Sequence, residues 1–169
     1  MLTVVQFIVF AIFPAGMAYA AVSDLLTMTI PNRLVLGLAA AFVIAVPLVG
    51  MDLTTFGLHL ATGGVVLAIA FGCFALGWVG GGDAKLVAVA ALWVGWQAGF
   101  AFVAYTCVFG GILTLLLLSF RARLLPVFAL RQEWVQRLHD PKVGVPYGIA
   151  IAASALLVYP HTVWMQLAG

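Results

Sequence analysis

Apolar runs separated by short polar links make up nearly the whole chain. Because about 20 apolar residues cross the hydrocarbon of a bilayer as one helix, runs of this length predict transmembrane helices. The fourth run is short, and it needs the preceding glycine segment to complete a crossing. The pattern therefore predicts an all-α polytopic fold with about six transmembrane helices. The runs cover residues 2–22, 30–49, 56–78, 86–96, 100–120 and 145–164.

The polar links carry signals for the ends of these helices. Pro31 suits the first turn of the second helix, where a missing N–H costs little. Asp52 is a typical N-cap residue for the third helix. Gly95 and Gly99 bracket a short segment that predicts a tight turn between the fourth and fifth runs.

The link at residues 121–142 has a pattern of its own. Four apolar residues follow i, i+3, i+7, i+11 spacing, with polar residues elsewhere round the helix, and Pro126 could begin it. Such a stripe favours a short cytoplasmic helix that lies in the headgroup region and contacts membrane lipids. A solvated linker helix is the alternative. The four apolar residues are Val127, Leu130, Trp134 and Leu138.

Composition agrees with a membrane protein, since 66% of the residues are hydrophobic, 7% are charged and the mean hydropathy is +1.23. We expect a single membrane-embedded domain over residues 1–169. The net charge of +2 gives no reason to expect a nucleic acid partner. Cys73 and Cys107 both lie inside apolar runs, so we interpret them as packing residues and expect no metal site and no cofactor.

The basic residues predict the orientation. With six crossings, all seven Lys and Arg residues fall on one side of the membrane, which the positive-inside rule makes cytoplasmic. Both termini then lie on the non-cytoplasmic side, and Asp24 and Asp83 share the cytoplasmic boundary. His59 and His161 lie toward the opposite face, and we interpret them as packing or interfacial residues.

The main candidate for chemistry is the segment Gly80-Gly81-Gly82-Asp83. A carboxylate beside the bilayer core is costly and marks a candidate functional site. Three glycines leave room for another backbone to approach it, and we expect their N–H and C=O groups to be free to pair with that backbone. A turn whose aspartate only caps the next helix is the structural alternative.

If Asp24 and Asp83 meet across a water, they can share one proton and act as general base and general acid in peptide hydrolysis. Lys85 lies off the helical face of Asp83, and its charge either favours ionisation of the pair or marks the interface.

Three motifs together resemble those of the type IV prepilin peptidases, membrane aspartyl proteases of the G-x-G-D class. The first is Asp24 followed by Ile30-Pro31-Asn32, the second is Gly80-Gly81-Gly82-Asp83, and the third is Val145-Pro146-Tyr147-Gly148. The resemblance covers the whole chain. It implies that Asp24 and Asp83 are catalytic and that Gly80, Gly81 and Gly82 let the substrate backbone approach. Pro31, Asn32 and Lys85 are possible supporting residues.

The chain lacks the cysteine-rich zinc module of the methylating family members. It is thus more similar to the short peptidases of tight-adherence (Flp-type) pilus systems or to archaeal preflagellin peptidases, which cleave without methylating. Presenilin and signal peptide peptidase resemble it less, because their first motif is Tyr-Asp. The implied partner is a prepilin with a short basic leader, a glycine before the cut and then an apolar helix. The implied location is the cytoplasmic (inner) membrane.

Two other function classes stay open at this point. In a proton- or ion-coupled transporter, Asp24 and Asp83 would be the coupling acids, although such proteins more often show repeat-related halves and polar groups near the midplane. A non-catalytic assembly scaffold is also compatible with the small size. The pattern predicts neither the oligomeric state nor which pilin is cut.

Overall fold

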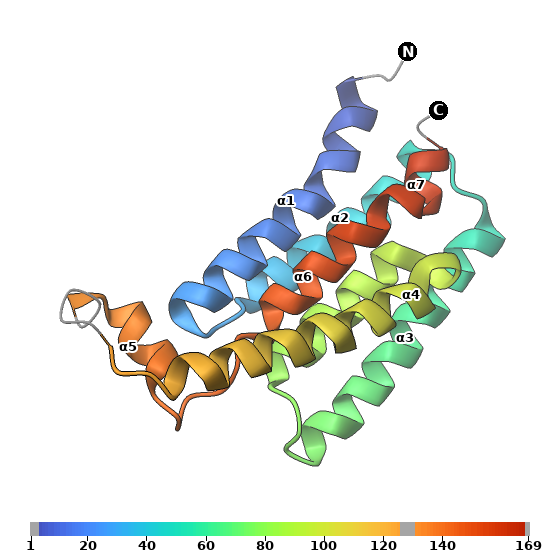
Figure 1. The fold of residues 1–169 in the computed structure, drawn as a ribbon. Coiled ribbons are helices and arrows are strands. Elements are labelled where there is room, and N and C mark those ends of the chain that lie inside the picture. Colours follow the sequence, from blue (N-terminus) through green and yellow to red (C-terminus); the bar gives the residue numbers. More distant parts are fainter. Residues whose placement is uncertain (1–3, 126–130, 168–169) are drawn as a thin grey trace.

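The computed structural model describes residues 4–125 and 131–167, and helices with no strand form the regular structure of these residues. The prediction of an all-α polytopic membrane fold is confirmed. Figure 1 shows the arrangement of the elements. They are α1 (Val4–Thr27), α2 (Asn32–Leu48), α3 (Leu53–Ala75), α4 (Gly81–Arg121), α5 (Glu133–His139), α6 (Tyr147–Val158), the 3-10 helix η2 (Tyr159–His161) and α7 (Val163–Gln166).

Within the described ranges, four segments are long and apolar enough to cross a membrane: Val9–Thr27, Leu53–Ala75, Gly81–Arg121 and Tyr147–Gln166. The apolar helix α2 has 17 residues and falls just below this length. Helix α4 has 41 residues, and Figure 1 shows that it folds back on itself, so that its two halves run in opposite directions. Helix α2 and the second half of α4 are thus apolar segments in addition to the other long helices, in keeping with the predicted pattern of runs.

The reversal inside α4 occurs at one residue, Gly95, whose φ is 75° and ψ is −179°. We predicted a turn spread over residues 95–99, but Ala98 and Gly99 are already helical. A positive φ favours glycine. The ring of His59 also approaches so closely that a Cβ at position 95 would lie 2.5 Å from it. The backbone angle and the histidine therefore both require glycine at this position.

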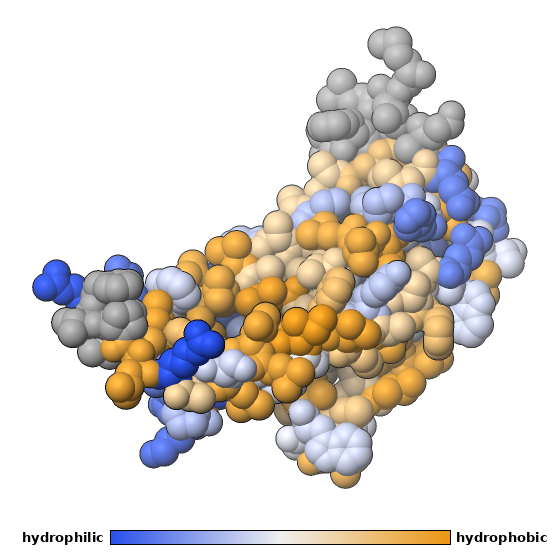
Figure 2. Space-filling view, viewed as in Figure 1, coloured by the Kyte–Doolittle hydropathy of each residue, from blue (hydrophilic) through white to orange (hydrophobic). Residues whose placement is uncertain are grey.

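The helices assemble so that several polar ends meet at one end of the bundle. Helix α6 packs between α1 and α4, and α3 packs against α4. In Figure 1, the end of α1 and the starts of α2 and α6 lie toward α5, while the start of α1 and helix α7 lie at the opposite end. Figure 2 shows hydrophobic residues over the middle of the visible face and hydrophilic ones toward both ends, as expected of a chain that faces lipid around its middle.

Aromatic side chains form the centre of the core. Trp93 stacks on Phe13, and Trp164 packs against Trp93 with ring centroids 4.7 Å apart. The indole N–H of Trp93 donates to Leu38 O, and that of Trp164 donates to Trp93 O. Buried indoles need such partners, because an unpaired N–H in an apolar interior costs free energy. These bonds fix α2, the first half of α4 and α7 relative to one another.

Three helix ends bear on the site. Helix α1 continues to Thr27, so Asp24 lies in its last turns. The hydrophobic run predicted a helix end near Val22, with Asp24 in the link that follows. Pro31 is the N-cap of α2 with extended backbone angles, and the helix itself begins at Asn32. Asp52 caps α3 as predicted, because its side chain accepts the N–H of Thr55. Hydrogen bonding to Thr55 lowers the pKa of the Asp52 carboxyl below its ordinary value.

The predicted interfacial helix is shorter than its apolar stripe, since α5 covers only Glu133–His139. Pro126, Val127 and Leu130 lie outside the described residues. Within α5, Leu138 is buried whereas Trp134 is exposed.

Arginine hydrogen bonds connect this loop to the bundle. Arg121 at the end of α4 donates to Leu138 O, Val143 O and Gly144 O. Arg137 donates to Leu26 O in the last turn of α1. Charged donors make hydrogen bonds stronger than neutral ones, so these contacts hold the chain that leads into α6.

Candidate active site

Asp24 is buried at the end of α1, with 5% of its surface exposed. Its Oδ2 accepts the backbone N–H of Gly148 at 2.7 Å. The other carboxylate oxygen has no hydrogen-bond partner among the described residues. Burying a carboxylate is costly without such bonds, so the Gly148 amide both stabilises and orients this side chain.

Gly148 is the second residue of α6, and its lack of a side chain is what lets Asp24 lie there. A Cβ at this position would be 2.8 Å from Asp24 Oδ2 and 3.0 Å from Asp24 Cβ. Real Cβ atoms do not approach other atoms so closely. From the sequence we recognised the Pro-Tyr-Gly segment but missed the contact, and the only signal was a glycine where a helix begins after Pro146.

Asp83 lies in the first turn of α4, where the helix dipole favours a negative side chain. It is half-buried. Gly80 is the N-cap of this helix, and a Cβ there would lie 2.9 Å from Asp83 Oδ2. The first glycine therefore leaves room for the catalytic candidate itself, an arrangement the sequence alone did not predict.

Gly81 and Gly82 begin α4 and Gly80 is its N-cap, so the glycine segment extends the short fourth run, as the sequence predicted. A Cβ at Gly81 would lie 3.2 Å from the Phe74 ring, and one at Gly82 would lie 3.4 Å from Ile30 Cβ. The carbonyls of these residues point into the helix, whereas the first N–H groups of a helix have no partner within it. Only the N–H side of this backbone is available to a ligand, which corrects our expectation that both N–H and C=O groups are free.

Asp24 and Asp83, which are far apart in the sequence, line one cavity of about 340 Å³. We call it the aspartate cavity. The cavity thus brings together both predicted catalytic residues and all three predicted glycines. Its lining residues are Asp24, Met28, Thr29, Ile30, Asn32, Gly80, Gly81, Gly82, Asp83 and Lys85.

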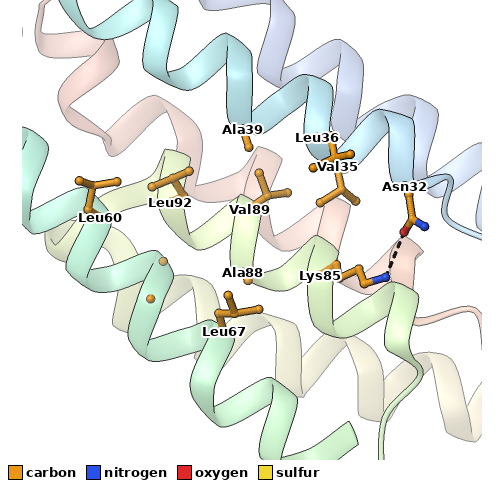
Figure 3. Close-up of a pocket in the computed structure, with 12 residues that line it drawn as sticks. Asn32, Val35, Leu36, Ala39, Leu60, Leu67, Lys85, Ala88, Val89 and Leu92 are labelled. Atoms are coloured by element: carbon orange, nitrogen blue, oxygen red, sulfur yellow. Dashed lines mark hydrogen bonds between the residues drawn. The ribbon is translucent and has the colours of Figure 1, made fainter.

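Two of the three possible supporting residues meet each other. Lys85 Nζ donates to Asn32 Oδ1 at 3.1 Å, a bond between α4 and α2 that Figure 3 shows at one end of a different cavity. Both residues also line the aspartate cavity. Pro31 does not line it, and its observed role is to begin α2. Lys85 therefore acts first as a link between the two helices that border the site.

Residues 11–115 match the model of the type IV leader peptidase family, which is more than half of the chain and includes both aspartates. The chain belongs to this family. It is accordingly a membrane-embedded leader peptidase, as the three motifs indicated. The matched region ends before Tyr147 and Gly148, so the contact between Gly148 and Asp24 is an observation on this structure alone. Comparison with curated proteins gave no match, and neither did comparison with solved structures.

The described part of the peptidase contains no group of three or more His, Cys, Asp or Glu side chains that could hold a metal ion. Lys85 supplies a cationic side chain to the lining of the aspartate cavity.

Proposed function

We propose that this leader peptidase is an aspartyl endopeptidase that removes the short basic leader of type IV, Flp-like prepilins at the cytoplasmic face of the inner membrane, without methylating the product. The observation that carries the proposal is that Asp24 and Asp83 line one cavity. The family match limits the reaction to leader cleavage and disfavours the transporter alternative.

The mechanism uses the two carboxylates as a unit. Two carboxyl groups in one small cavity repel each other when both are ionised, so they hold one proton between them. The ionised member takes a proton from a water molecule, which attacks the peptide carbonyl, and the protonated member donates to the carbonyl oxygen. The Gly148 amide fixes the direction of Asp24 and so keeps one of its oxygens in a constant position.

The glycines at the start of α4 give the substrate access to the two carboxylates. A peptide must be extended at the bond that is cut, because a helix keeps its own amides paired. The N–H groups at the start of α4 are free to donate to the carbonyls of such a strand, and Gly81 and Gly82 offer no side chain that would hold it away. A basic leader fits a site that lies at the polar end of the bundle and contains two acids. Membrane lipids surround the rest of the chain.

The test is in vitro cleavage of a synthetic prepilin-like peptide by the purified protein in detergent, with the new N-terminus read by mass spectrometry. We expect cleavage by the natural sequence and none by Asp83→Asn. Asp52→Asn and Asp140→Asn are controls, because both acids lie outside the aspartate cavity. Full activity of Asp83→Asn, or no cleavage of any basic-leader substrate, would contradict the proposal.

A further inference from the structure

A second cavity lies directly beside Asp83. It has a volume of about 510 Å³ and its lining comes from α3, both halves of α4, and α6. We call it the lateral cavity. Apart from Asp83, its lining is mainly apolar or small, and it includes Ala70, Val103, Gly111 and Ile151. A cavity of this size and polarity is typical of a site for apolar side chains.

Asp83 belongs to both cavities, and the lateral cavity extends from it toward the middle of the bundle. Val87, one helical turn after Asp83, lies on the same face of α4 and continues the wall. The opposite wall is formed by residues 103–111, in the middle of the second half of α4. The lateral cavity thus extends farther along the membrane-spanning helices than the aspartate cavity does.

In a substrate that is cut beside Asp83, the leader and the segment after the cleaved bond extend away from this residue in different directions. A leader with several positive charges does not fit a mainly apolar cavity between membrane-spanning helices, because burying each charge there is costly. An apolar segment fits there without this cost. On the proposed function, we therefore propose that the lateral cavity binds the apolar side chains that follow the cleaved bond, while the leader lies in the aspartate cavity.

The third cavity, drawn in Figure 3, is of similar size, about 560 Å³, but it lacks this relation to the catalytic candidates. Its polar end is formed by Lys85 and Asn32, which are hydrogen-bonded to each other, and no carboxylate lines it. A substrate placed there would have no acid at the cleaved bond. It therefore provides a matched control for the lateral cavity.

The two cysteines of the chain, Cys73 and Cys107, both line the lateral cavity and serve as natural probes. The Asp24→Asn variant, which should bind but not cut, is mixed with prepilin peptides that carry one cysteine each, and then mildly oxidised. Cysteines in the first turns after the cut should form disulfides with the protein, and cysteines in the leader should not. The variant with both cysteines changed to serine should form none. Stronger cross-linking of the leader, or no cross-linking at any position, would overturn the assignment.

A second experiment fills each cavity in the active protein. Gly111 lines the lateral cavity and Gly64 lines the cavity in Figure 3, and a Cβ at either position meets no atom within 4 Å. Gly111→Leu should lower the cleavage rate at subsaturating substrate at least tenfold, about 1.4 kcal/mol, whereas Gly64→Leu should change it less than twofold.

Equal effects of the two substitutions would overturn the cavity assignment. Cleavage by the natural sequence reports separately on the proposed function, because failure there would count against the peptidase itself. If Gly111→Leu does not fold, the cross-linking result alone decides, since its test protein, Asp24→Asn, carries no substitution in the lateral cavity.

Discussion

The contact between Gly148 and Asp24 gives a sharp prediction for Gly148→Ala. A new Cβ would lie 2.8 Å from Asp24 Oδ2 and 3.0 Å from Asp24 Cβ. Because the Cβ of Asp24 is fixed to its backbone, rotating the carboxylate does not relieve the contact. To bring the contact with Asp24 Cβ from 3.0 Å to an ordinary separation of 3.4 Å, α1 and α6 must move apart by about 0.4 Å at this point.

A displacement of this size moves the reacting carboxylate out of position. Misplacing a catalytic group by about 1 Å can cost about 10²-fold in rate. We therefore expect Gly148→Ala to lower kcat by about 10-fold to 10²-fold, which is about 1.4–2.7 kcal/mol in the barrier. Helix propensity acts in the opposite direction, because alanine is favoured over glycine inside a helix by about 1 kcal/mol. The variant should thus lose activity without a matching loss of thermal stability.

The assay is the initial rate of peptide cleavage, measured beside a thermal unfolding curve in the same detergent. Gly144→Ala is the control, because Gly144 lies in the same segment, is exposed, and a Cβ there meets nothing within 4 Å. It should cut at the natural rate. Natural activity in Gly148→Ala would show that the position of Asp24 does not depend on this contact, and it would refute the reasoning.

Three further predictions concern the glycines and the topology. Gly82→Val should block cleavage, because its side chain would fill the aspartate cavity where the substrate backbone approaches; normal cutting in the peptide assay would refute this. Gly95→Ala should lower the thermal unfolding temperature, since a positive φ with ψ near 180° costs a residue with a Cβ about 1–3 kcal/mol and the neighbouring histidine ring leaves no space. Cysteine labelling should place positions Met28 and Gln132 in the cytoplasm and Asp52 outside it, and labelling of the first two from opposite sides would contradict the shared face.

Much of the fold could be predicted because hydrophobic runs report directly on helices that face lipid. The cap at Asp52 followed from a short local pattern, and the structure confirms it. A count of crossings placed Asp24 and Asp83 at the same boundary of the membrane, but only the structure shows that they line one cavity.

The details that could not be predicted are those set by distant contacts. Nothing local to Asp24 indicates that α1 continues past it, because the amide that satisfies its carboxylate belongs to Gly148, 124 positions later. The single-residue reversal at Gly95 likewise depends on the ring of His59. A glycine in a sequence indicates that space is needed, but only the structure shows which atom occupies it.

The central claim is that Asp24 and Asp83 act as one unit, and single-turnover cleavage rates of Asp24→Asn, Asp83→Asn and the double variant test it most directly. Removing either member of a unit removes its function, so losses within a unit are strongly non-additive. The account predicts that both single variants fall to the same residual rate and that the double variant is no slower. Substantial cleavage by either single variant, or losses that multiply in the double variant, would contradict it.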